Sequence, residues 1–267
     1  MNENLEASES NRSMPTLLLN STAAAIVLLG LGLTLYVLTA PLGVWLGMWD
    51  FRQGFAILRN AEPYALWIAG VGAVVTIAGL LGMFKFNLGN NSKLMWLALV
   101  ATVLTFTAYQ LPRVYGYQGG LPPIHDVATD TDNPLNYVAI APLRADAPNS
   151  MVYGESQRMT REEHAQAQRQ AYPDIVTQRF SEPAEEIFDR AVAAVEDLGW
   201  ELVAAVPADG RIEATDTTFW FQFKDDVVIR IERQGNETVL NARSLSRVGG
   251  SDFGKNAQRL RDLFARL

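Results

Sequence analysis

His125 and Asp126 are the neighbouring residues of this 267-residue chain that are best suited to chemistry. A histidine beside a carboxylate could act as a general base with its orienting group. With Asp130 and Asp132, which follow closely, the same segment could instead supply oxygen ligands for Ca²⁺. The spacing DxxxDxD lacks the DxDxDG alternation and the terminal Glu of a calcium loop. Such dense Asp and Thr residues more often form local turns through side-chain to backbone hydrogen bonds, so a turn is the simpler interpretation.

A second polar cluster comes directly before the aromatic run FWFQF, at residues 219–223. Trp220, Phe221 and Phe223 could form the wall of an apolar ligand groove with Asp216 at its mouth. The alternative is a strand end whose aromatic side chains fill the core under the helices.

A third cluster lies before the last predicted helix and contains Arg243, Ser246 and Arg247. The exposed N–H groups of a helix start, beside two guanidinium groups, could bind a carboxylate or phosphate. Asp252 is placed to cap this helix and to occupy those donors itself. Salt bridges to Asp216 or Asp226 are the alternative role for the arginines.

Composition excludes several classes of function. The chain has no cysteine, which rules out disulfides, thiolate metal sites and cysteine nucleophiles. The polar tail has no GxSxG motif, so a serine hydrolase lacks its nucleophile elbow. Residues 1–111 hold five basic and five acidic residues, so the net charge of −7 belongs entirely to the tail, and an acidic domain does not favour nucleic acid. We expect no metal and no cofactor, and the alternative to a binding protein is a hydrolytic or metal-assisted enzyme that uses His125 and Asp126.

Long charge-free stretches in the first 111 residues must anchor these clusters to a lipid bilayer. A membrane core about 30 Å thick needs about 20 apolar residues in a helix, and each buried charge is costly. After an acidic tail at 1–15, residues 16–111 are therefore predicted to form three transmembrane helices, at about 21–46, 65–84 and 94–111.

Basic residues near the ends of the spans favour the cytoplasmic side. Lys85 and Lys93 lie in one very short loop, whereas acidic residues accompany Arg52 and Arg59 on the other side. We therefore expect the N-terminus inside and the tail outside, which describes a multi-pass protein of a bacterial inner membrane with an extracytoplasmic C-terminal domain.

The tail is predicted to contain an irregular connector at 112–174 and a compact domain at 175–267. Apolar alternation and helix signals in the compact part give the order strand, helix, four strands, helix. Hairpin-length links permit only antiparallel pairing, so we expect an α+β fold with two helices on one face of an antiparallel sheet, similar to a helix-grip fold.

Three segments of the tail carry a resemblance to a known family: PPIHDVATDTDNP, GWELVAAVPADGRIEATDTTFWFQFKDDVVIRI and RSLSRVGGSDFGKNAQRLRDLF. Together they resemble domain of unknown function family 1499 over nearly the whole tail. The resemblance implies several membrane spans before the domain but no activity. From the residues we predict a domain that binds a small-molecule ligand of unknown identity or a membrane or envelope protein, or that organises other proteins, without catalysing a reaction.

Overall fold

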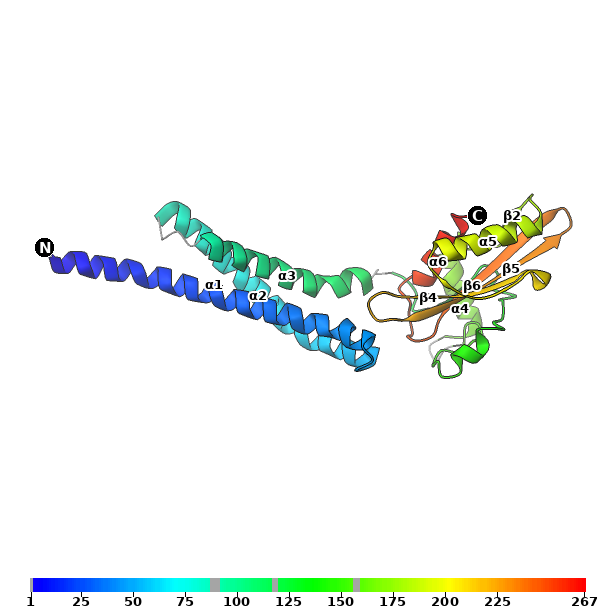
Figure 1. Ribbon diagram of the computed structural model, residues 1–267, viewed down its shortest axis with the longest axis horizontal. Helices are drawn as coiled ribbons and strands as arrows, with labels where there is room; N and C mark the ends of the chain where they lie inside the picture. The colour runs from blue at the N-terminus through cyan, green and yellow to red at the C-terminus, as the bar shows by residue number, and fades with distance from the viewer. Residues whose placement is uncertain (1, 87–91, 117–119, 156–158) are drawn as a thin grey trace. The chain divides into compact units, whose positions relative to one another are not determined.

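The computed structural model describes residues 2–86, 92–116, 120–155 and 159–267 and divides the chain into two compact units. The first unit is Met1–Tyr117 and the second is Gln118–Leu267. Helices alone form the described part of the first unit, whereas the second combines a sheet with helices (Figure 1).

The first unit contains α1 (Asn2–Trp45), α2 (Phe51–Phe86) and α3 (Ser92–Gly116). Small side chains let these helices approach closely: a Cβ added at Gly72 would overlap the hydroxyl of Thr102. Most of the exposed large apolar side chains of the described residues lie on these three helices. Hydrocarbon solvates such a surface better than water does.

Two of these helices are long and apolar enough to cross a membrane, in Leu17–Trp45 and Phe51–Gly82. In α3 the described apolar stretch is Lys93–Ala108, whose 16 residues at about 1.5 Å each span about 24 Å, less than a hydrocarbon core of about 30 Å. Of the three predicted spans, two are therefore supported. The helix α1 also begins within the predicted acidic tail, because a helix keeps its backbone hydrogen bonds beyond the apolar region.

One antiparallel sheet of six strands forms the centre of the second unit. Five strands lie in the order β1-β6-β5-β4-β3, and β2 also pairs with β6. The strands are β1 (Asp126–Ala128), β2 (Gln178–Phe180), β3 (Glu201–Val206), β4 (Arg211–Thr217), β5 (Lys224–Gln234) and β6 (Glu237–Ser246). The predicted antiparallel α+β domain is confirmed.

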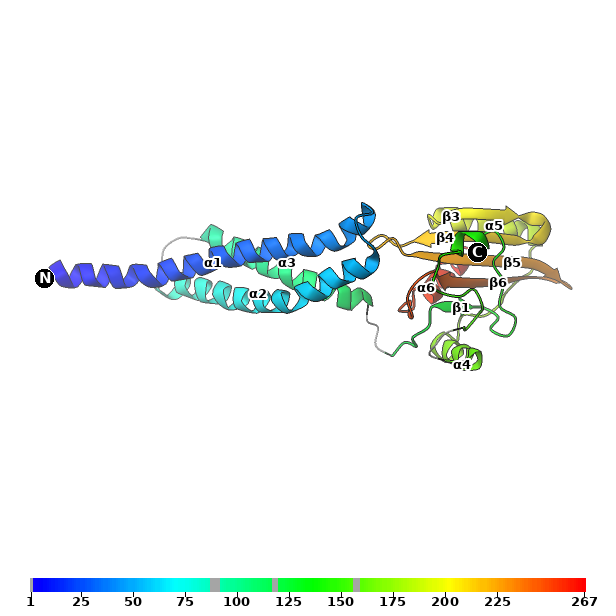
Figure 2. The ribbon, with the colours of Figure 1, turned by 90° about the horizontal axis from the view of Figure 1, so that it is seen from below.

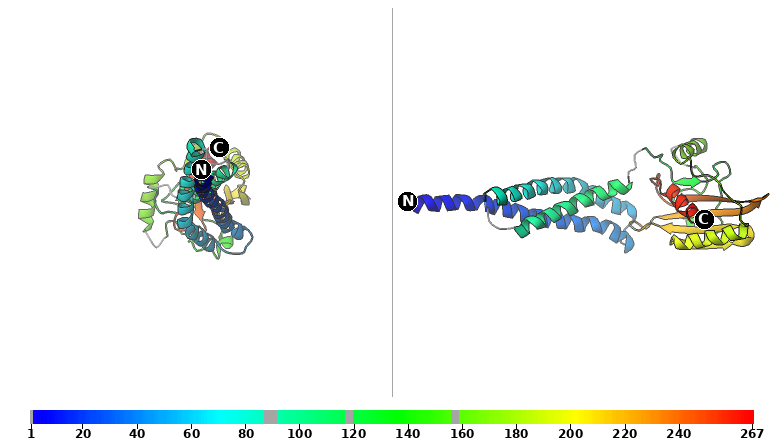
Figure 3. Two further views of the ribbon diagram at one scale, coloured as in Figure 1. Left: turned by 90° about the vertical axis from the view of Figure 1, so that its left-hand side faces the viewer. Right: turned by 90° about the horizontal axis from the view of Figure 1, so that it is seen from above.

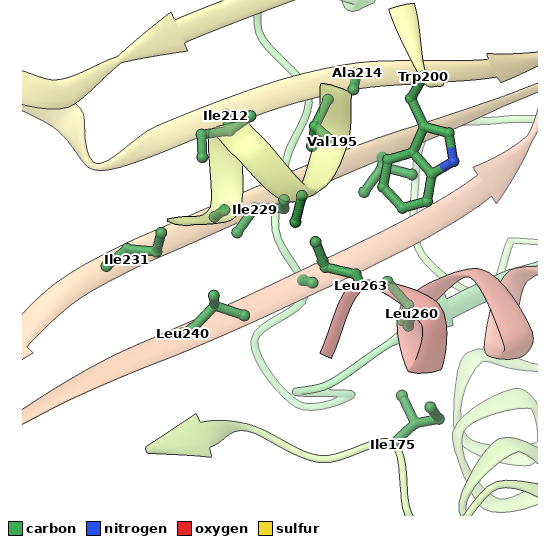
Figure 4. Close-up of a cluster of buried hydrophobic side chains, with 14 of the residues drawn as sticks. Ile175, Val195, Trp200, Ile212, Ala214, Ile229, Ile231, Leu240, Leu260 and Leu263 are labelled. Atoms are coloured by element: carbon green, nitrogen blue, oxygen red, sulfur yellow. The ribbon is translucent and has the colours of Figure 1, made fainter. Parts of the chain in front are cut away.

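Two helices, α5 (Ala184–Asp197) and α6 (Lys255–Phe264), pack on one face of this sheet. Alternate residues of each strand point toward the helices and form the main core with them (Figure 4). The core includes Val195 of α5, Leu260 and Leu263 of α6, and Ile212, Ile229, Ile231 and Leu240 of the strands. Each large aliphatic side chain buried in this way stabilises the fold by about 1.5–3 kcal/mol.

The segment between β1 and β2 covers the opposite face, where Tyr137 and Ile140 pack against Val228 and Leu245. Its helix α4 (Arg161–Ala171) lies beside the edge strand β1, at the edge of the sheet away from α5 (Figure 3, right). This corrects the prediction of an irregular connector at 112–174, because the compact unit begins at Gln118 and β1 belongs to the sheet. Buried polar contacts, and not a periodic apolar face, hold this segment on the sheet, so its sequence shows no hydrophobic periodicity.

Helix α4 begins with a capping box of Thr160 and Glu163, and although its sequence is polar on all sides, three of its residues are buried. The side chain of Gln168 exchanges hydrogen bonds of 3.0 and 2.7 Å with the backbone N–H and carbonyl of Ala128. His164 is 1% exposed, and its Nε2 lies 2.8 Å from the carbonyl oxygen of Asp126. Helix α4 therefore covers strand β1 through polar contacts.

Candidate functional site

Three buried carboxylates lie on the sheet face opposite α5 and α6. The register pairs Asp226 with Leu245, Leu245 with Asp126, and Glu213 with Val228. Residues directly opposite each other on neighbouring strands point to the same face. The carboxylates of Asp126, Glu213 and Asp226 therefore all face the covering segment, and each forms an ion pair with an arginine on this side of the sheet.

Asp126 and Arg243 form a bidentate ion pair between β1 and β6. The Nε and Nη2 atoms of Arg243 donate to the two carboxylate oxygens at 2.9 and 2.8 Å, and both side chains are at most 2% exposed. The guanidinium also donates to the carbonyls of Leu135 and Met151, at 2.7 and 2.8 Å. Burial lowers the pKa of Arg243, but the charge and hydrogen bonds of Asp126, with contributions from Tyr137 and Tyr153, together outweigh burial and raise the pKa, so the group stays cationic. The pair thus fixes two points of the covering segment to the sheet.

Asp226 accepts hydrogen bonds from two arginines and a hydroxyl. Arg144 comes from the covering segment, Arg247 follows β6, and the hydroxyl of Thr215 lies 2.7 Å away. Burial raises the pKa of Asp226, but the hydrogen bonds from Arg247, Thr215 and Arg144 outweigh burial and hold the pKa below its ordinary value. A carboxylate with these acceptor sites filled is poorly placed to act as a base.

Glu213, in the middle of β4, binds the backbone of the covering segment. Its carboxylate accepts hydrogen bonds from the N–H groups of Val138, Ala139 and Ile140 at 2.8–3.2 Å and from Arg211. The side chain is fully buried. The residues that follow Tyr137 are therefore held by charge-assisted hydrogen bonds, which are stronger than neutral ones.

A pocket of about 400 Å³ lies where the covering segment meets Arg161, at the start of α4. Its lining includes Asn136, Tyr137, Met151, Tyr153, Arg161 and Arg243. The Arg243 guanidinium carbon lies 5.3 and 5.6 Å from the ring centroids of Tyr137 and Tyr153, so cation–π contacts hold both rings. The Tyr153 hydroxyl donates to Gln168 at 2.8 Å. The pocket thus has aromatic walls, a thioether and two guanidinium groups, within the size range of small-molecule sites.

The structure does not bring His125 and Asp126 together as a base and its orienting carboxylate. Neighbouring residues of a strand point to opposite faces, and both oxygens of Asp126 bind Arg243. Burial lowers the pKa of His125, and in the described residues its Nδ1 has no hydrogen-bond partner. This geometry lends no support to the predicted enzymatic alternative.

Asp130 and Asp132 lie in a turn. One oxygen of Asp130 accepts hydrogen bonds from the N–H groups of Asp132 and Asn133, as the turn interpretation expects. The side chain of Asp132 is 87% exposed and lies 3.8 Å from Arg169. Across the described residues, no three His, Asp or Glu side chains converge as ligands for a metal ion.

The aromatic run lies in the loop that joins β4 to β5, not in the core under the helices. Phe219 is 66% exposed and Trp220 is 45% exposed. Trp220 does not line the pocket described above, and Asp216 does not open into a groove, because it binds Arg259 at 2.8 Å.

The residues of the third sequence cluster separate in space. Arg243 lies on the pocket face, and Arg247 forms the predicted salt bridge with Asp226 at 2.9 Å. On the helix face, the hydroxyl of Ser246 accepts a hydrogen bond from Asn256 at 3.0 Å. Asp252 accepts hydrogen bonds from the N–H groups of Gly254 and Asn256, although the helix cap itself is Gly254. Asp252 therefore occupies the donors that were candidates for an anion.

Several of the best-connected polar residues were not singled out from the sequence, namely Arg144, Tyr137, Tyr153, Glu213 and Arg259. Glu213 offered a signal, because its charge lies in the middle of a predicted strand. The arginine and tyrosines of the covering segment offered none, since no periodic pattern surrounds them.

Fold and site together define an α+β domain with one antiparallel sheet, two helices on one face and a polar, pocket-bearing cover on the other, preceded by apolar helices. The chain belongs to the family described as "Protein of unknown function (DUF1499)", which it matches over residues 126–267, more than half its length. The match begins at the first residue of β1. Comparison with curated proteins finds no match.

Proposed function

We propose that this protein is a membrane-anchored binding protein whose second unit takes up a small organic anion in the pocket beside Tyr153 and Arg161. The pocket is the observation that carries the proposal. The buried carboxylates around it are engaged by arginines and backbone N–H groups, which favours binding over acid–base catalysis.

The chemistry of the lining defines the class of ligand. Tyr137 and Tyr153 offer rings against which a planar or apolar body packs. Arg243 is neutralised by Asp126, whereas Arg161 is an exposed cation at the start of α4 whose Nη2 donates only to a backbone carbonyl among the described contacts. A ligand carboxylate or phosphate would bind Arg161, since guanidinium groups match both geometrically.

Membrane anchorage is the second part of the proposal. Helices α1 and α2 have the length and composition of membrane spans, and we propose α3 as a third that uses residues beyond Ala108. With three spans, the distribution of basic residues favours the second unit outside the cytoplasm, and we propose that the helices anchor it in the inner membrane of a bacterium. An apolar surface on all three helices supports a lipid environment.

The ligand proposal is tested on the full-length protein in lipid nanodiscs, with 4-fluorobenzoate as the probe and fluorine NMR as the readout. Arg161→Gln should weaken binding of the probe. Arg169→Gln is the matched control, because Arg169 is also an exposed arginine of α4 but does not line the pocket. Equal affinity in the two variants, or no binding to the unmodified protein, would reject the proposed site.

Orientation is tested separately with Asn236→Cys, which places a thiol in an exposed turn of a chain without native cysteine. A membrane-impermeant maleimide should label this variant in intact bacterial cells. Protection in intact cells together with labelling after lysis would reverse the orientation.

A further inference from the structure

The loop that joins β4 to β5 presents two aromatic side chains on a hydrogen-bonded turn. The N–H of Thr218 donates to the carbonyl of Phe223 at 2.8 Å, and the Thr218 hydroxyl accepts from the N–H of Phe223 at 2.9 Å. The rings of Phe219 and Trp220 contact each other edge to face, 5.3 Å apart. They are 66% and 45% exposed. The turn therefore displays a pair of large aromatic rings to the surroundings instead of burying them.

Phe253 presents a third exposed aromatic ring on the segment between β6 and α6. It is 45% exposed and has a φ of +54°, a left-handed conformation that is uncommon for a bulky residue. The N–H of the preceding Asp252 donates to the carbonyl of Ile124 at 3.0 Å, and that of Arg247 donates to the carbonyl of Lys224 at 3.0 Å. The β4–β5 loop, the segment before α6 and the segment that leads into β1 therefore meet at one end of the sheet.

This end of the sheet is the one at which the chain arrives from α3. Strand β1 runs antiparallel to β6, so it starts beside the end of β6 and the beginning of β5. Figure 2 shows the β4–β5 loop and the start of β1 at one end of the second unit and the β5–β6 turn at the other. Nine residues separate Gly116 from Asp126, a connection that reaches at most about 35 Å. The chain therefore enters the sheet of the second unit at its aromatic end.

We propose that the exposed rings of Phe219, Trp220 and Phe253 insert into the interfacial region of the bilayer that holds the N-terminal helices. The ring of Trp220 favours this region because its faces contact acyl chains and its indole N–H reaches the headgroups. The apolar rings of Phe219 and Phe253 gain from contact with the acyl chains. Lys224 and Lys255, both exposed, flank the rings at the same end and match lipid phosphates. The inference rests on the proposed membrane anchorage and adds a second, interfacial attachment to it.

The test uses the full-length protein in phospholipid vesicles, with single-cysteine variants labelled by the fluorophore NBD. Phe219→Cys and Trp220→Cys report on the loop, and Phe253→Cys reports from a separate segment if a loop variant misfolds. Asn236→Cys in the β5–β6 turn is the matched control at the opposite end of the sheet. Doxyl-labelled lipids should quench the labels at 219, 220 and 253, with a blue-shifted emission, but not the label at 236.

Flotation of the vesicles after a carbonate wash separates the two proposals. If the protein does not float with the vesicles, membrane anchorage fails, and the interfacial contact fails with it. If it floats but the labels at 219, 220 and 253 are as accessible to iodide as the control and escape doxyl quenching, only the interfacial contact is overturned. Labels shielded from both quenchers would mean that a protein surface, such as a second copy of the chain, covers the rings, which also overturns it.

Discussion

Replacing Asp226 by asparagine tests whether the buried ion pairs hold the covering segment on the sheet. The carboxylate is fully buried between Arg144 and Arg247, and the side chain of Arg144 is 1% exposed. Asp226→Asn leaves these guanidinium groups without their counter-charge, and breaking a buried pair in this way costs about 3–5 kcal/mol. A domain of this size loses about 2–4 °C of melting temperature per kcal/mol, so we expect a decrease of about 6–20 °C.

The assay must report on the second unit alone, since the full chain contains two units. Ala242→Cys in the core, 1% exposed, supplies a unique thiol whose reaction with maleimide on heating marks unfolding of the domain. Asp197→Asn is the matched control, because it breaks an Asp–Arg pair whose aspartate side chain is 71% exposed and which is worth at most about 1 kcal/mol. Equal, small shifts for Asp226→Asn and Asp197→Asn would refute the assigned role.

Acid should destabilise the domain through Asp226, because the pKa of this carboxyl is lower in the folded domain than the value of about 3.9 expected in the unfolded chain. The stabilisation by the ionised carboxylate is complete above the unfolded-state pKa and is lost as the pH falls through the folded-state pKa. Near-UV circular dichroism should therefore show a shallower acid dependence for Asp226→Asn, and an unchanged slope would contradict this. Gly210→Ala should lower the thermal midpoint of thiol exposure more than Gly235→Ala does. Both glycines have φ near +60°, but a Cβ at 210 overlaps a backbone carbonyl of β5, whereas a Cβ at 235 meets open space. Equal effects of the two substitutions would argue against the overlap. Glu213→Gln should increase hydrogen exchange at the amide of Ile140, which donates to Glu213 at 2.8 Å, and unchanged protection would show that other contacts hold the segment.

The elements of the second unit after residue 175 were largely predictable from sequence. The alternation in residues 226–233 predicts a strand, and β5 covers Lys224–Gln234. The acidic turn after Ser181 predicts a helix, and α5 begins at Ala184. These signals are local: a half-buried strand alternates every second residue, and an amphipathic helix repeats every 3.6.

The part of the fold between β1 and β2 could not be predicted in the same way. Strand β1 has only three residues, too few for an alternation to stand out. The sequence of α4 is polar on all sides and has no apolar face, yet His164 and Gln168 are both 1% exposed because they bind the backbone of β1. The pocket was not predicted either, since most of its lining comes from residues 134–161, which show no periodic pattern, and only the fold brings Arg243 of β6 beside them.

Local composition alone determined the apolar helices, the acidic character of the tail and the order of strands and helices, because hydrophobic burial and backbone geometry act over a few neighbouring residues. Only the tertiary structure decided which charges meet: Asp126 and Arg243 are 117 residues apart in the chain and share two hydrogen bonds. From the sequence alone, such a carboxylate could serve as a base, as a metal ligand or as a structural contact. Pairing with a buried arginine makes it a structural contact, because an ion in a low-dielectric interior is stable only when an opposite charge compensates it.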